Sequence, residues 1–199
     1  MEQAELILEY WFGTDADDLV AANQHAALWW KKNPQVDQEI RERFASLLDA
    51  AANGDLDDWL THPRGRLALI ILADQFSRNM YRDTPRSFAF DQFAQTWCKA
   101  GLDNGADRLL RPIERVFFNL PLEHSESLED QQRSVALCKS LAESVPDAHR
   151  ELFDGYLKYA ERHRDIVQRF GRFPHRNAIL GRESTEEEIA FLQQPGSSF

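Results

Sequence analysis

The sequence predicts an all-α fold, an array of antiparallel helical hairpins with about nine or ten helices. Apolar residues recur at three- and four-residue steps along most of the chain, which is the period of a helix with one buried face. No segment alternates apolar and polar residues as a half-buried strand does. The connections between the apolar stripes are short, and short connections make consecutive helices antiparallel neighbours. Nothing divides the chain, so we predict one domain over residues 1–199.

Four apolar stripes locate the main helices in chain order. They are Val36, Ile40, Phe44, Leu47, Leu48 and Ala51; Phe90, Phe93, Trp97 and Ala100; Ile113, Val116, Phe117 and Leu120; and Leu152, Tyr156, Tyr159, His163, Ile166 and Phe170. The last stripe predicts a helix of about five turns. Trp29 and Trp30 are adjacent, and adjacent helical residues do not share a face, so one of the two rings is expected to be partly exposed.

Turn residues between the stripes predict where helices begin and end. A glycine directly after a helical pattern is typical of a helix C-terminus. Three helices are therefore expected to end at Gly54, Gly105 and Gly171. The segment 184–187 predicts a capping box between Ser184 and Glu187, which opens a last helix.

Composition indicates a soluble globular protein in a reducing compartment. Hydrophobic residues make up 43% and charged residues 28% of the chain, a normal globular balance. The net charge of −10 disfavours nucleic-acid binding. The two cysteines, Cys98 and Cys138, cannot form a disulfide framework, and no apolar run approaches the roughly 18–20 residues of a membrane helix. The acidic N-terminus lacks the start of a signal peptide, so we expect a cytoplasmic protein that does not bind membranes.

Arginines gather near the C-terminal end of the chain. Residues 158–182 carry seven cations and two acids, although the chain as a whole is acidic. Turn residues predict that one helix ends and another begins between Arg172 and Arg176. A helix N-terminus presents free backbone N–H groups, so these arginines and Asn177 predict a site for a phosphate or a carboxylate. The alternative is that the arginines pair with acidic residues on the surface.

A second set of polar residues follows the most apolar run of the chain. Asp74 comes directly after residues 67–73, so it is expected to be buried and to need a partner. It forms either an Asp–Arg pair that fixes helix packing or a pocket acid with a shifted pKa. Arg78 and Asn79 lie in the same segment and are further candidates for binding an anion.

A glutamate and a histidine follow a proline. Pro121 is expected to interrupt or kink a helix, which leaves Glu123 and His124 at an irregular, exposed point. A histidine with a carboxylate performs acid–base chemistry or binds a metal, or else the pair caps a helix. The spacing matches no zinc signature, so we predict no metal site and no cofactor. His163 lies in an apolar stripe. It is either a core histidine with one satisfied hydrogen bond or, together with the neighbouring tyrosines, part of a pocket.

The last five residues, Pro195-Gly196-Ser197-Ser198-Phe199, have a composition that frays unless something holds it. Our hypothesis is that Phe199 docks in an apolar slot with its carboxylate near an arginine. The predicted domain therefore includes a docked C-terminal tail.

Several of these motifs together resemble one protein family over nearly the whole chain. The motifs are Trp11-Phe12-Gly13; Asp74-Gln75-Phe76 with Arg78-Asn79; Pro85-Arg86; the segment from Pro121 to Glu126; the segment from Arg169 to Asn177; and Pro195-Gly196-Ser197-Ser198-Phe199. They are similar to an uncharacterised bacterial family, the domain of unknown function 924. The resemblance implies an all-helical, tetratricopeptide-like, right-handed superhelix in the cytoplasm, and it implies no activity.

The sequence supports two functions. In the first, a pocket binds a small anionic metabolite and catalyses its hydrolysis or a group transfer. The predicted catalytic residues are Asp74, Glu123, His124 and His175, and the predicted ligand-binding residues are Arg78, Asn79, Arg172, Arg176, Asn177 and His163. In the second, the chain is a tetratricopeptide-like interaction module without catalysis, whose groove binds the carboxylate of a peptide. RNA binding along residues 158–182 is disfavoured by the net charge.

Overall fold

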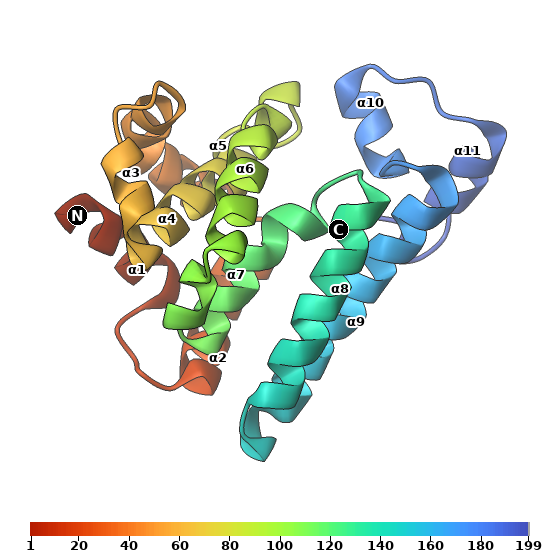
Figure 1. Cartoon of the computed structure of the whole chain (residues 1–199). Coiled ribbons are helices and arrows are strands. Elements are labelled where there is room, and N and C mark those ends of the chain that lie inside the picture. Colours follow the sequence, from red (N-terminus) through yellow and green to blue (C-terminus); the bar gives the residue numbers. More distant parts are fainter. Residues whose placement is uncertain (199) are drawn as a thin grey trace.

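The computed structural model of the chain describes residues 1–198, and helices form most of it (Figure 1). The α-helices are α1 (Glu2–Phe12), α2 (Asp18–Trp30), α3 (Pro34–Ala52), α4 (Pro63–Ile70), α5 (Ser77–Met80), α6 (Asp91–Asp103), α7 (Pro112–Glu123), α8 (Leu128–Ser144), α9 (Asp147–Phe170), α10 (Asn177–Leu180) and α11 (Glu186–Leu192). Short 3-10 turns are η1 (Asp57–Thr61), η3 (Pro85–Phe88), η4 (Ala106–Leu109) and η5 (Pro174–Arg176), and η2 (Ile71–Phe76) is a π-helix. α4, η2 and α5 follow one another without a break, so the described chain has ten helices and no strand. The predicted all-α fold is confirmed.

The continuous helix of residues 63–80 is the centre of the fold. α1, α3, α6 and α7 pack around it, and residues 65–77 are all buried. A helical segment that is buried on every side has apolar residues on every side. The burial of this helix therefore accounts for the long apolar run before Asp74. Within it the N–H of Ser77 bonds to the carbonyl of Leu72, five residues back, as in a π-helix. This π turn positions Asp74, and the apolar pattern did not predict it.

A long antiparallel hairpin, made by α8 and α9, lies beside the bundle that α1 to α7 form (Figure 1). α7 joins the two parts, because it packs on α4 and α6 as well as on α8 and α9. The short helices α10 and α11 lie beyond the end of α9 (Figure 1). Gly171 ends α9 in the predicted left-handed conformation, with a φ of 69°, and at 24 residues the helix is longer than predicted.

Two local predictions at helix ends have different outcomes. Trp30 is 51% exposed while Trp29 is buried, which confirms that the two rings at the end of α2 do not share a face. The predicted capping box is wrong by one residue. Thr185 accepts from the N–H of Glu188, and the Glu188 carboxylate accepts from the N–H of Thr185, so α11 begins one residue later than expected. Within the described residues, no helix combines the length and the apolar character that crossing a membrane requires.

Candidate functional site

A cavity of about 870 Å³ collects side chains from α2, α5, α7, α9 and the segment 175–179. Seven of the predicted site residues line it, although they come from distant parts of the chain. They are Arg78, Asn79, Glu123, His124, His163, His175 and Arg176. Asp74 does not line the cavity but is hydrogen-bonded to a residue that does. The structure therefore brings eight of the ten predicted residues to one place.

The innermost polar contact is an Asp–His pair. Asp74 is 1% exposed, and its carboxylate oxygens lie 2.7 Å and 3.0 Å from Nδ1 of His124. It also accepts a hydrogen bond of 2.6 Å from the Gln75 amide. Burial by itself would raise the pKa of Asp74, but Arg78 and His124 lower it well below its ordinary value. Asp74 is therefore ionised, and His124 donates its Nδ1 proton to it, which leaves Nε2 as the unprotonated nitrogen of the neutral ring.

Burial also sets the protonation of the other groups around this pair. It lowers the pKa of His124, against the opposing charge of Asp74. Burial lowers the pKa of His163 to about 3 and that of His175 to about 4. All three rings are therefore neutral at neutral pH, so none of them is a cation available to pair with a nearby carboxylate.

Glu123 is buried at the end of α7, which corrects the prediction of an exposed position. α7 continues through Pro121 to this residue, and α8 and α9 pack against α7. Nδ1 of His163 lies 3.1 Å from Glu123 Oε1 and donates to the carbonyl of Tyr159 at 2.8 Å. Burial and the charge of Asp74 raise the pKa of Glu123 to about 8. The carboxyl is therefore mostly protonated at neutral pH.

The two arginines of the cavity differ in how their donors are used. Arg78 binds both carboxylate oxygens of Asp91, at 2.8 Å and 3.1 Å, and the carbonyl of Asp74 at 2.9 Å. Arg176 has a side chain that is 8% exposed, and its ion pair with Asp91 spans 3.7 Å. Its guanidinium lies over the rings of Phe88 and Phe173, at 4.8 Å and 4.5 Å from their centroids.

The guanidinium of Arg176 has donors to spare. Its Nε has no hydrogen-bond partner among residues 1–198. Burial, and the neighbouring charge of Arg78, lower the pKa of Arg176 to about 10, so it stays charged at neutral pH. A buried polar group without a partner calls for an explanation, such as a bound water, an ion or a functional role, and of the described arginines with such an atom Arg176 lines the larger cavity.

The structure does not bring Arg172 and Asn177 into the cavity. Both bind Glu188, a buried residue of α11: Arg172 Nε and Nη2 lie 2.7 Å and 2.8 Å from its carboxylate, and Asn177 Nδ2 lies at 3.2 Å. The predicted anion cradle between the helices is also filled from within the chain. Glu126 accepts from the N–H of Phe173 at 2.8 Å, and Arg182 binds the same carboxylate. The chain's own carboxylates therefore serve as the anions there.

Other predicted features have partners of their own. The amide of Asn79 donates to Asp37 at 2.8 Å, and Arg82 binds the same carboxylate. The residues that sequence reasoning missed are Asp91, Phe88, Trp30 and Gly155. The only signal for Asp91 was a short repeat, Asp91-Gln92-Phe93 after Asp74-Gln75-Phe76, which is too short to carry a prediction.

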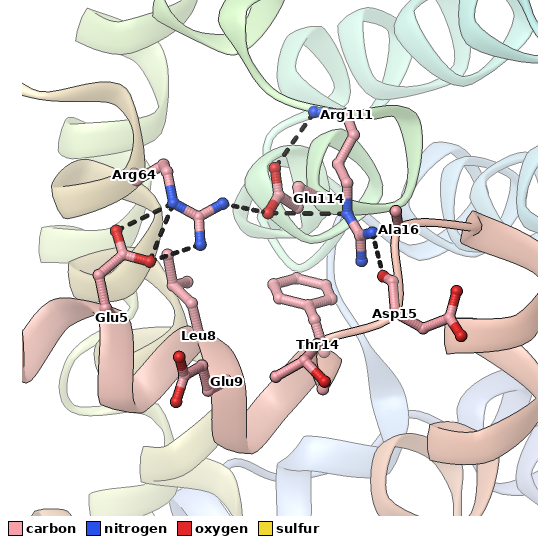
Figure 2. Close-up of a pocket in the computed structure, with 11 residues that line it drawn as sticks. Glu5, Leu8, Glu9, Thr14, Asp15, Ala16, Arg64, Arg111 and Glu114 are labelled. Carbon is pink, nitrogen blue, oxygen red and sulfur yellow. Dashed lines mark hydrogen bonds and ion pairs between the residues drawn. The ribbon is translucent and has the colours of Figure 1, made fainter.

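A second, smaller cavity is lined by arginines that have carboxylate partners. It has a volume of about 300 Å³ and lies where α1 meets the loop to α2. Figure 2 shows Arg64 between the carboxylates of Glu5 and Glu114, and Arg111 between Glu114 and the carbonyl of Asp15. Its arginines are held in ion pairs that span the pocket, so this cavity is not the candidate site.

Two further predictions concern the metal and the tail. Among the described residues, no group of three or more His, Cys, Asp and Glu side chains is arranged to hold a metal ion. The predicted docking of Phe199 falls on a residue outside those that the structure describes. The described part of the tail reaches the cavity, where Ser198 is one of the lining residues.

Comparison with known proteins identifies a family and a solved structure of the same fold, neither of which has an assigned activity. A family model described as "Bacterial protein of unknown function (DUF924)" matches residues 7–196. A solved structure of a protein of unknown function from Agrobacterium tumefaciens has 36% sequence identity to the chain and a TM-score of 0.80. The match covers 96% of this chain and 97% of that one. No curated protein matches the chain. Because the family model spans nearly the whole sequence, the chain belongs to the bacterial family of unknown function DUF924.

Proposed function

We propose that this protein is an enzyme that binds a small anionic metabolite in the larger cavity and catalyses hydrolysis or group transfer on it. The observation that carries the proposal is one juxtaposition. Arg176, a buried cation with unused donors, lines the same cavity as His124, whose ring is held by a buried aspartate. One group suits recognition of an anion, and the other suits proton transfer.

Arg176 supports anion binding through its charge and its surroundings. A guanidinium presents five donors in a planar fork that matches a carboxylate or a phosphate. Arg78 already holds Asp91 with two hydrogen bonds, so Asp91 is only a distant partner for Arg176 at 3.7 Å. An anionic ligand would complete the hydrogen bonds of Arg176 in a site of low dielectric, where a charge-assisted hydrogen bond is strong.

His124 and Glu123 support proton transfer because their protonation states at neutral pH are complementary. His124 is neutral, so its Nε2 can accept a proton from an attacking water or hydroxyl group. Glu123 is mostly protonated, so it can donate a proton to the group that leaves. In hydrolysis, the water oxygen bonds to the substrate as its proton passes to Nε2 of His124. The bond between the substrate and the leaving oxygen breaks as that oxygen takes the proton of Glu123. Asp74 acts as a positioning residue that fixes the ring of His124.

A thermal-shift panel tests the anion site. The probes are inorganic phosphate, phenyl phosphate, acetate and phenylacetate. A ligand at a hundred times its Kd stabilises the folded state by about 2.7 kcal/mol, which raises the Tm of a chain of this size by roughly 5–10 °C. We expect at least one probe to give such a shift and Arg176→Gln to abolish it.

The matched control is Arg172→Gln, since Arg172 lies in the same segment but is bound to Glu188 outside the cavity. This variant is expected to keep the ligand-induced shift. Equal shifts in wild type and Arg176→Gln, or no shift with any probe, would contradict the proposed site.

The alternative function, a peptide-interaction module, is supported by one observation. Ser198, near the C-terminal end of the chain, lines the cavity, so one segment of polypeptide already borders it. The panel therefore includes a free peptide of sequence Gln-Pro-Gly-Ser-Ser-Phe, tested on a variant that lacks residues 197–199. Stabilisation by this peptide and by none of the small anions would favour the module over the enzyme.

The pH dependence of hydrolysis tests the roles of the two proton-transfer groups. The rate is expected to rise as His124 loses its proton, at a pH below its ordinary pKa of 6.5. It is expected to fall as Glu123 loses its proton, near pH 8. The measurement follows release of phosphate from an alkyl phosphate and from nitrophenyl phosphate across the pH range. The alkaline fall should be smaller for nitrophenyl phosphate, whose leaving group departs without a proton. A rate that does not fall between pH 7 and about 9 would contradict the role of Glu123, and a rate that does not fall at any pH below 6.5 would contradict the role of His124.

A further inference from the structure

The cavity extends well beyond its charged end. Its lining includes an apolar part formed by Trp30 of α2, Leu120 of α7, and Leu152, Gly155 and Tyr156 of α9. A volume of about 870 Å³ is in the range of a drug-sized ligand, and a phosphate or a short carboxylate would leave most of it empty. We propose, on the basis of the proposed function, that the substrate is an elongated anion whose apolar, ring-bearing body lies against Trp30, Gly155 and Tyr156.

One face of α9 sets the length of this body. Leu152, Tyr156, Tyr159 and His163 are separated by three or four residues and all line the cavity, so the cavity runs along the helix. Gly155 and His163 are eight positions apart, which corresponds to about 12 Å along a helix axis. His163 belongs to the charged end, where it contacts Glu123. The apolar part of the cavity at Gly155 therefore lies about 12 Å along α9 from His163 at the charged end.

Gly155 is unexplained by the packing of the protein itself. It lies in the interior of α9, where glycine is unfavourable relative to other residues because it leaves the unfolded chain more freedom. A Cβ atom built at this position would meet no described atom within 4 Å apart from its chain neighbours and the adjacent backbone of α9 itself. Gly101, by contrast, is needed, because a Cβ there would lie 2.5 Å from Arg66 and from Phe118. The lack of a side chain at Gly155 therefore keeps a part of the cavity open.

Trp30 supplies a ring surface at the same end of the cavity. Its indole stacks on Phe117 with a centroid distance of 5.7 Å and an interplanar angle of 16°, and it lies 6.2 Å from the ring of Tyr156. The residue is nevertheless 51% exposed. A ring surface of this kind, fixed by its neighbours and continuous with a cavity, favours a planar apolar group over a flexible polar one.

Titration calorimetry with matched ligands tests the inference. The ligands share a head group and differ in body: inorganic phosphate, phenyl phosphate and biphenyl phosphate, and acetate, phenylacetate and biphenylacetate. Burying a ring is expected to tighten binding by about 10–100-fold relative to the head group alone. The change in heat capacity on binding should become more negative in the same order, because apolar surface is buried.

Gly155→Leu is the matching variant. It fills the apolar end, so it should remove the gain from the ring and leave the affinity for phosphate and acetate unchanged. Its fold is expected to be intact, with a Tm equal to that of the wild type or about 2–4 °C higher, because leucine is the better helix former and Cβ meets no clash. Lys158→Leu, an exposed position of the same helix outside the cavity lining, is the control and should keep the gain.

The outcomes separate this inference from the proposed function. Binding of phosphate or acetate that depends on Arg176 but gains nothing from a ring would overturn the inference and leave the anion site standing. A ring gain that survives Gly155→Leu would overturn the placement of the body along α9. Binding of none of the six ligands would overturn the proposed function, and the inference with it.

Discussion

Replacing Asp74 by asparagine is expected to lower the free energy of unfolding by about 3–5 kcal/mol at pH 7, the loss typical of breaking a buried ion pair. For a chain of this length that corresponds to a fall in Tm of roughly 6–20 °C. The carboxylate is 1% exposed and accepts from His124 and from Gln75, with the guanidinium of Arg78 3.5 Å away. An asparagine amide would place N–H donors against these donors. The substitution would also remove the negative charge of Asp74, which partly neutralises Arg78.

The control for this variant is Asp103→Asn. Asp103 is 68% exposed and pairs with Arg133 at the surface, so its loss is expected to change the free energy of unfolding by less than about 1 kcal/mol. The folded-state pKa of Asp74 is lowered from 3.8, so its contribution is present above that value and is lost as the pH falls further. The difference between wild type and Asp74→Asn should therefore shrink in acid. Denaturant unfolding at several pH values measures it, and a difference below about 1 kcal/mol at pH 7 would show that this contact does not stabilise the fold.

The helices could be predicted because most of them bury one face, and a single buried face makes apolar residues recur every three or four positions in the sequence. Ile113, Val116 and Phe117 follow that period and are buried as expected. The period fails where a helix has apolar residues on more than one side. In α6 the predicted stripe includes Phe93, which is 38% exposed, while the buried face runs through Ala94 and Trp97. It also fails for the π turn at residues 71–76, because a segment buried on every side carries no period to reveal its register.

The sequence could predict most of the residues that gather at the candidate site but not the contacts that each of them makes. Burial of Asp74 follows from the apolar run before it. Its contact with His124, fifty positions away in the sequence, depends on how α7 crosses the central helix, and local pattern does not encode that crossing. Arg172 and Arg176 have the same sequence context, yet one binds Glu188 and the other faces the cavity. Which arginine meets Glu188 depends on the position of α11. That position is set by the N-cap residue Thr185 and by the packing of α11 on η5.

Replacing Glu123 by glutamine is expected to stabilise the protein above neutral pH, by about 2–3 kcal/mol at pH 8. The pKa of this carboxyl is raised from 4.5 in the unfolded chain to about 8 in the folded protein. Between these values the folded state binds more protons than the unfolded state, so stability falls as the pH rises. Each pKa unit is worth about 1.4 kcal/mol, which sets an upper bound of roughly 4–5 kcal/mol on the loss at pH 8. Glutamine keeps the shape of the protonated acid and does not ionise, so the variant avoids this loss.

The same substitution is expected to act in opposite directions on stability and on turnover. Thermal unfolding of wild type and Glu123→Gln should agree near pH 4.5 and diverge as the pH rises, whereas Glu129→Gln, at an exposed position of α8, should follow the wild type throughout. Hydrolysis of an alkyl phosphate should be slowed by about 100-fold or more, because glutamine cannot supply the proton that the leaving oxygen requires. Lower stability at pH 8 would mean that the carboxylate is ionised and well paired in the folded protein. In that case Glu123 could not serve as the acid, and the site would retain only the anion-binding arginine and the neutral histidine.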